Sequence, residues 1–137
     1  MTKLLPAKKE ISYILRIGVA LTFVGHGVFA LSVKADWIPF LTYVGFSETS
    51  AITVMPLIGI LDLVVAAAAL FYPIRILLFW AALWAFSAAL MRPLTGYPIW
   101  DFIERGANWA TPLALLILQG WPNSFEGWFT IRDTIKE

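Results

Sequence analysis

Asp62 and His26 are the two side chains of this sequence whose positions call for a chemical explanation. Asp62 lies inside the apolar run LIGILDLVVAAAAL, and His26 lies between two glycines in the run GVALTFVGHGVFAL. A charged group near the centre of a bilayer costs about 2.5–3.5 kcal/mol on insertion scales, so such groups usually face the interior of a helical bundle. A carboxylate and an imidazole in such a place can carry a proton or anchor a ligand near neutral pH.

Both residues also have a purely structural interpretation. Gly59, Ala66 and Ala69 fall on the helical face of Asp62, and small residues around a polar group are typical of packed membrane helices. The carboxylate would then be a polar clamp between helices, and the histidine a buried core residue. A rise of about 1.5 Å per residue places His26 roughly 8 Å, and Asp62 roughly 16 Å, below the ends of their helices. That difference argues against a direct pair unless helix tilt, water or a ligand bridges them.

A stripe of aromatic residues adds a third candidate surface. Trp80, Trp84, Ser87 and Met91 recur at helical spacing in one apolar segment. Such a stripe is most often core packing, but it also fits a slot for a flat apolar ligand such as a quinone. The sequence leaves both interpretations open.

The stretch RPLTGYPIWDFIERGANW, residues 92–109, is the most distinctive part of the chain. Its prolines, glycines and aromatic residues predict a folded lid over the end of a bundle, because an extended loop would expose a contiguous apolar patch. In such a lid, Arg92 or Arg105 would meet an anionic or carbonyl group of a ligand. Asp101, Glu104 and Arg105 equally fit salt bridging within one helical turn. The predicted ligand-binding residues are His26, Asp62, Trp80, Trp84, Arg92, Glu104, Arg105 and Asn108.

The residue types exclude several other chemistries. The sequence has no cysteine and one histidine, so disulfides, thiolate ligands, a structural zinc site and a bis-histidine haem are not expected within the chain. No metal site is predicted. The net charge of +1 indicates no nucleic-acid partner.

Four apolar segments must position these residues, at about 11–31, 51–72, 76–91 and 108–121. A membrane-spanning helix needs about 20 mostly apolar residues, or somewhat fewer with polar ends. Hydrophobic residues make up 60% and charged residues 14% of the chain, against about 45–50% and 25% in soluble domains. The mean hydropathy is +0.78, more apolar surface than a small soluble domain can bury. The sequence predicts an all-α, single-domain integral membrane four-helix bundle with an ordered extracytoplasmic loop.

The distribution of lysine and arginine predicts the orientation. One side of the predicted bundle carries Lys3, Lys8, Lys9, Arg75, Arg132 and Lys136, and the other carries Lys34, Arg92 and Arg105. Positively charged residues concentrate on the cytoplasmic side. Both termini are therefore expected in the cytoplasm and both long connections outside.

The chain resembles the DoxX-like family of small four-helix membrane proteins. The resemblance rests on Arg16-Ile17-Gly18 leading to Gly25-His26-Gly27, on Gly59-x-x-Asp62, on the turn after the second segment, and on Glu104-Arg105-Gly106-Ala107-Asn108-Trp109. The family name is tied to subunits of a thiosulfate:quinone oxidoreductase. The resemblance therefore implies a multi-pass protein of a bacterial inner membrane with a quinone or partner-protein site. Relatives often carry a glutamate where this chain has Asp62.

Three functions remain open on these grounds. The preferred one is an accessory or interaction subunit of a membrane complex, with redox chemistry in its partners, because no catalytic constellation stands out. The second is a quinone-linked redox component, and the third is a small transporter or proton-conducting protein using Asp62 and His26. The expected partners are the lipid bilayer and either other membrane subunits or further copies of the chain; a quinone is the one cofactor suggested.

We expect Thr95→Cys, introduced into the otherwise cysteine-free chain, to react with a membrane-impermeant thiol reagent only from the extracytoplasmic side. Lys9→Cys is the matched control and should react only from the cytoplasm. Labelling intact cells and inverted vesicles measures both. Reaction of Thr95→Cys solely in inverted vesicles would reverse the predicted orientation.

Overall fold

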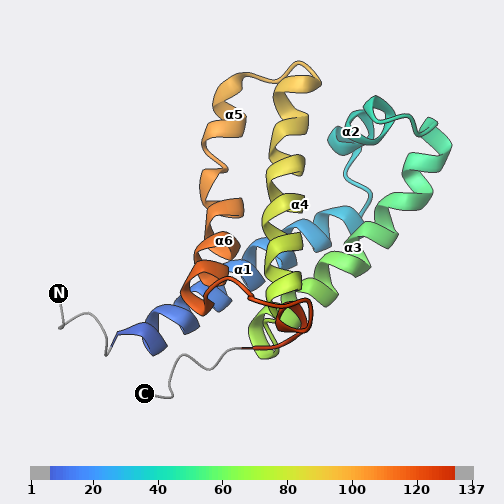
Figure 1. Ribbon diagram of the computed structural model, residues 1–137. Helices are drawn as coiled ribbons and strands as arrows, with labels where there is room; N and C mark the ends of the chain where they lie inside the picture. Colours follow the sequence, from blue (N-terminus) through green and yellow to red (C-terminus); the bar gives the residue numbers. More distant parts are fainter. Residues whose placement is uncertain (1–6, 132–137) are drawn as a thin grey trace.

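The computed structural model describes residues 7–131, and every regular element in that range is helical (Figure 1). The long helices are α1 (Lys8–Leu31), α3 (Glu48–Phe71), α4 (Arg75–Leu94) and α6 (Gly106–Gln119). The short elements are the 3₁₀ turn η2 (Ala35–Trp37), α2 (Ile38–Tyr43), α5 (Ile99–Ile103) and the 3₁₀ turn η3 (Glu126–Phe129). The predicted all-α class is confirmed.

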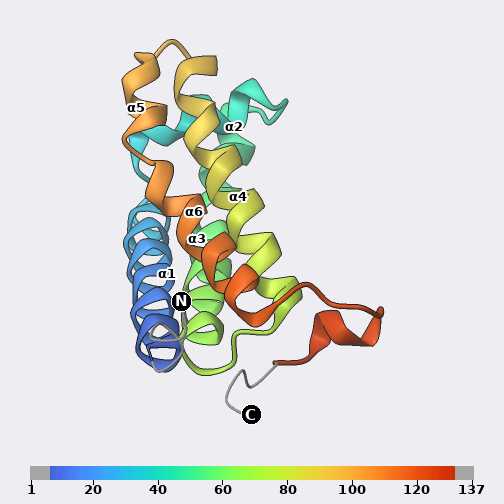
Figure 2. The same cartoon turned by 60° about the vertical axis from the view of Figure 1, so that its left-hand side comes forward.

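The long helices alternate in direction and form two pairs. Figures 1 and 2 show α2 and α5 at one end of the molecule, here called the loop end, and η3 at the opposite end with the α3–α4 turn, here called the turn end. Helix α1 packs along α3, α4 packs along α6, and α1 also contacts α6. Helices α3 and α4 touch only sparsely, although a short turn joins them.

Local sequence signals set the ends of α3. The side-chain oxygen of Ser47 accepts a hydrogen bond from the backbone N–H of Ser50 at 3.1 Å. This cap satisfies one of the N–H groups that the first helical turn leaves free. Pro73 follows the last residues of α3, where a residue without an N–H cannot continue the helix. The predicted tight turn between the second and third segments is present at residues 72–74.

Two glycines allow α1 and α3 to approach closely. A Cβ atom at Gly59 would lie 2.8 Å from the carbonyl oxygen of Gly27 and 2.8 Å from the backbone nitrogen of Leu31. Small residues permit such backbone contact between helices in membranes. The core beside this contact consists of small and medium apolar side chains with one phenylalanine: Val19, Ala20, Phe23, Val65, Ala66, Ala69, Ala81 and Ala85.

Three helices, α1, α3 and α4, are long and apolar enough to cross a membrane. Helix α6 has 14 residues and extends about 21 Å at 1.5 Å per residue. It is shorter than the roughly 30 Å hydrocarbon core of a bilayer. Length and composition thus support membrane crossing for three of the four predicted segments.

The stretch after Arg92 is folded, but it does not hide all of its apolar side chains. Helix α4 continues to Leu94 and α5 follows after a short turn. Phe102 packs edge-on against Phe86 of α4, with ring centroids 5.6 Å apart. Trp100 remains 70% exposed and Ile103 is also exposed, so the stretch covers less of itself than the sequence predicts.

Arg75 ties the turn end together from inside the protein. This guanidinium is only 4% exposed. It donates hydrogen bonds to the carbonyl oxygens of Gln119 (3.0 Å), Gly120 (2.7 Å) and Gly127 (2.9 Å), and to the hydroxyl of Thr130 (3.3 Å). The sequence identifies Arg75 only as a cytoplasmic positive charge; the structure shows that it joins α4 to the end of α6 and to the tail.

After α6 the described part of the tail contains one short element, the 3₁₀ turn η3. Residues 132–137 lie outside the described range. Lys3, Arg132 and Lys136, three of the charges behind the predicted orientation, also lie outside it.

Gly59→Ala should destabilise the protein by about 1–3 kcal/mol, because its methyl group would meet the backbone of α1 and force the helices apart. Gly25→Ala is the matched control on α1, since a Cβ there meets nothing within 4 Å. It should be neutral or stabilising by about 0.5–1 kcal/mol. Thermal unfolding in detergent or nanodiscs measures both, and equal stability of the two variants would contradict the close contact.

Candidate functional site

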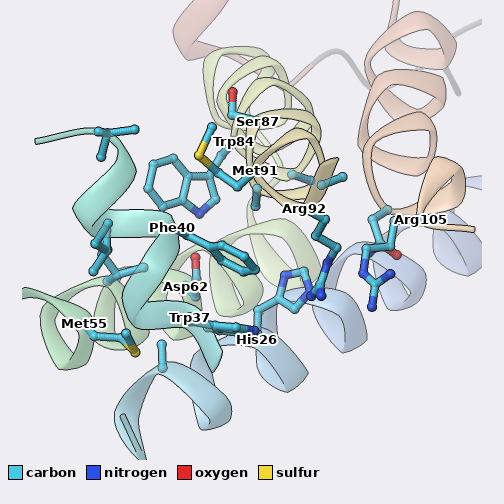
Figure 3. A pocket seen from close by; sticks show the side chains of 18 residues that line it. His26, Trp37, Phe40, Met55, Asp62, Trp84, Ser87, Met91, Arg92 and Arg105 are labelled. Atoms are coloured by element: carbon cyan, nitrogen blue, oxygen red, sulfur yellow. The ribbon is translucent and has the colours of Figure 1, made fainter. Parts of the chain in front are cut away.

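A cavity of about 220 Å³ lies between α3 and α4, with η2 and α2 across it (Figure 3). Residues of α1 and of the beginning of α6 complete its wall. The cavity exists because α3 packs against α1 and α4 packs against α6, so that α3 and α4 make few contacts with each other. Side chains of α2, among them Phe40 and Leu41, close the resulting gap.

Most of the cavity wall is apolar or aromatic. The apolar lining residues are Ala30, Leu41, Val44, Met55, Ile58, Ala85, Ala88, Ala89 and Met91. The rings of Trp37, Phe40 and Trp84 add flat surfaces. Ligand sites in proteins typically combine such walls with a few convergent polar groups.

Asp62 forms one polar end of the cavity. The residue is 3% exposed, and Trp84 lies within hydrogen-bonding reach of its carboxylate. Gly59, Ala66 and Ala69, predicted to share its face, are buried beside it on α3. Its position is compatible with a ligand anchor, because the carboxylate borders the cavity. It is also compatible with a polar clamp between helices, because Trp84 of α4 lies beside the carboxylate.

Cationic side chains form the other polar end, near the loop end of α4. Arg92 and Arg105 line the cavity together with His26. Figure 3 shows the side chains of Arg92 and His26 reaching toward one another. The backbone positions of Trp84 and Arg92 are eight residues apart on one helix, or about 12 Å along its axis. Arg92, Arg105 and Lys34 all act on His26 through their charge.

Aromatic contacts hold this cationic end in place. The Trp37 ring packs edge-on against the His26 ring with centroids 5.7 Å apart. The Arg92 guanidinium lies over the Phe40 ring, 5.5 Å from its centroid, a cation–π geometry. Elements η2 and α2 therefore contribute aromatic rings that pack against His26 of α1 and Arg92 of α4.

Two hydrogen-bond donors at the cavity have no partner among the described residues. Arg92 Nε and Trp37 Nε1 are both buried and unpaired in this part of the chain. A buried donor without an acceptor costs about 1–3 kcal/mol. Neighbouring atoms cover both nitrogens, so an acceptor in the cavity would reach them only after these side chains shift.

The structure brings together six of the eight predicted ligand-binding residues. His26, Asp62, Trp84, Arg92, Arg105 and Asn108 all line the cavity. Trp80 stacks on Trp84 with centroids 5.4 Å apart but is not part of the lining. The Glu104 side chain is 64% exposed and is paired with Arg105, as the local salt-bridge interpretation predicts. Their ligand-binding roles remain predictions.

Sequence reasoning missed the contribution of the first long connection. Trp37, Phe40, Leu41 and Val44 line the cavity from η2 and α2. Their spacing of three to four residues is a helical signal, but it covers too few residues to stand out from a loop. Gln119 near the end of α6 donates a hydrogen bond to the carbonyl oxygen of Pro73 in the α3–α4 turn, at 2.9 Å.

Metal binding has no support in the part of the chain that the structure describes. Residues 7–131 contain no group of three histidine, cysteine, aspartate or glutamate side chains that could hold an ion.

Comparisons with protein-family models, with curated proteins and with solved structures find no match to this chain.

Asp62→Asn should preserve stability, because the amide oxygen can still accept a hydrogen bond from Trp84. Asp62→Leu should lose about 1–3 kcal/mol, since it leaves that donor unpaired. Thermal unfolding measures both. The control is the same Asp62→Leu change made in a Trp84→Phe background, where no donor remains to be orphaned and the loss should shrink. An equal loss in both backgrounds would show that the pair contributes nothing.

Proposed function

We propose that this protein is an integral membrane four-helix bundle of the DoxX-like type that binds a small, flat, largely apolar ligand of quinone-head size, as the binding component of a membrane redox complex. The observation that carries the proposal is the cavity between α3 and α4. It joins aromatic walls to polar groups at both ends, within a bundle whose outside is apolar.

The exterior of the long helices supports insertion into a bilayer. Ile14 and Leu21 on α1, Leu57 and Val64 on α3, and Leu83 on α4 are large apolar residues that are at least half exposed. In water such surfaces mark interaction sites or aggregation hazards, whereas lipid is a suitable solvent for them. Helix α6 joins them as the fourth span, with α5 extending it toward the loop end.

The charges support the orientation with the turn end in the cytoplasm. Lys8 and Lys9 begin α1, and Arg75 begins α4, at the turn end. In this orientation the cavity lies in the outer half of the bundle, since Arg92 and Arg105 are near the loop end. The bacterial inner membrane is the compartment that the family resemblance implies.

The size and lining of the cavity support a ring-shaped ligand. An engineered cavity of about 150 Å³ lined by apolar residues holds benzene, so 220 Å³ accommodates one ring with small substituents. The indole of Trp84 and the ring of Phe40 offer surfaces for it, and Asp62, His26 and Arg92 can hydrogen-bond to carbonyl groups on its edge. A longer tail would have to leave through the sparsely packed α3–α4 side.

A redox role requires electrons from elsewhere, because the chain has no cysteine and its side chains supply binding groups. The protein would hold the ligand while a partner subunit carries the redox centre. This division fits an accessory subunit with a ligand site of its own.

Ala88→Leu should weaken binding of a short-chain benzoquinone about tenfold, because the larger side chain occupies cavity space; tenfold corresponds to about 1.4 kcal/mol. Quenching of tryptophan fluorescence in nanodiscs measures the affinity. Ala67→Leu, the same change at an exposed position of α3, is the matched control and should leave binding unchanged. Equal affinity of both variants would remove the cavity as the binding site.

A further inference from the structure

We propose that the ligand is a monoanionic aromatic acid of about benzoate size, with its carboxylate held by Arg92 and Arg105. The inference rests on the proposed ligand-binding function and adds the charge of the ligand to it. It distinguishes an aromatic acid from the neutral quinone that the resemblance implies.

The first argument is the excess of positive charge at one end of the cavity. Arg92 and Arg105 both line this end of the cavity. Among the described residues the salt bridge in this region is that of Arg105 with Glu104, and Glu104 lies on the exposed side of it. Asp101 and Glu104 act on Arg92 through charge, but neither lines the cavity. A bound carboxylate would give these cations a partner inside the cavity.

The second argument is the pair of unused donors. Arg92 Nε and Trp37 Nε1 are buried without an acceptor among the described residues, and both side chains border the same cavity. A carboxylate has two oxygens with several lone pairs, and it forms charge-assisted hydrogen bonds with arginine that are stronger than neutral ones. One carbonyl oxygen of a neutral ligand could also accept from both donors, but the bond to arginine would lack the charge assistance that a carboxylate provides.

The third argument is the opposite sign of the other end. Asp62 borders the cavity about two helical turns below Arg92 along the bundle, beside Trp84. A second acidic group on the ligand would be forced toward this carboxylate and repelled. A diacid is therefore disfavoured, and a ligand with one acid group and an uncharged ring fits both ends.

The volume fixes the size of the ring system. The cavity measures about 220 Å³, roughly one and a half times the apolar cavity of about 150 Å³ that holds benzene. Benzoate adds one carboxylate to that ring. The aromatic side chains of Trp37, Phe40 and Trp84 supply flat surfaces for it.

The test compares benzoate with benzamide, which has the same shape and no charge. Binding to the purified full chain in phosphatidylcholine nanodiscs is followed by ligand-observed NMR or equilibrium dialysis. We expect benzoate to bind about tenfold more tightly than benzamide. Arg92→Gln should remove this preference, and Arg92→Lys, which keeps the charge, should restore it. Lys9→Gln removes an exposed charge from the first turn of α1 and is the matched control; it should preserve the preference.

Each of the other possible outcomes would reject a specific part of the proposal. Equal affinity for benzoate and benzamide, with loss of both in Ala88→Leu, would keep the cavity as a ligand site and reject the anionic ligand. Binding of the benzoquinone without binding of benzoate or benzamide would also keep the cavity as a ligand site and reject the anionic ligand. Absence of binding by all three probes would reject the proposed function as well. Loss of benzoate binding when phosphatidylglycerol replaces phosphatidylcholine would show that a lipid head group is the anion, and would overturn the aromatic acid.

Discussion

The close contact of α1 and α3 at Gly27 and Gly59 is the constraint on which the rest of the structure depends. It draws α3 against α1 along its length, while α4 is drawn against α6. The 72–74 turn joins the end of α3 to the start of α4, so these two helices are close together at the turn end. Over the rest of their length they make few contacts with each other. The cavity occupies this gap, and α2 folds across it because an unfilled apolar gap would forfeit dispersion contacts on both walls.

The same arrangement separates charges that would otherwise neutralise one another. Asp62 comes from the middle of α3, and Arg92 from the loop end of α4. No salt bridge joins them in the described part of the chain. Most of the lining between them is apolar and includes Ala85, Ala88 and Met55, with Ser87 and Asn108 as further polar residues. The result is a small space with an acceptor at one end and donors at the other.

The sequence predicts the all-α class and six of the residues that line the cavity, but not how they meet. Long apolar runs predict the helices because a chain in lipid has few alternatives to helix formation. Asp62 and His26 stand out because ionisable groups in such runs are costly. Their depths, counted along separate straight helices, argue against a direct pair. The structure gives no direct bond between them, yet both border one elongated cavity, which counting along single helices cannot reveal.

Other features depend on contacts distant in sequence and have no local signal. The ring of Trp37 meets His26 from η2, and Phe40 lies under Arg92 from α2. Arg75 looks like an ordinary turn charge, since its acceptors, Gln119 to Thr130, come 44 to 55 residues later. The fourth helix begins and ends two residues earlier than expected, and Gly120 follows its last residue with a positive φ of 80°, a conformation that glycine adopts without strain.

The hydrogen bonds of Arg75 also determine where the molecule can yield. They clamp the first turn of α4, the last turn of α6 and the tail into one block, and Gln119 fastens the 72–74 turn to the same block. Helices α3 and α4 are joined at this block, so any movement that separates them pivots there. The displacement of the two helices would grow with distance from the turn end. At the loop end, α2 lies across the gap between α3 and α4, where packing and the cation–π contact of Phe40 with Arg92 hold it. We therefore expect this gap to widen more readily at the loop end than at the turn end.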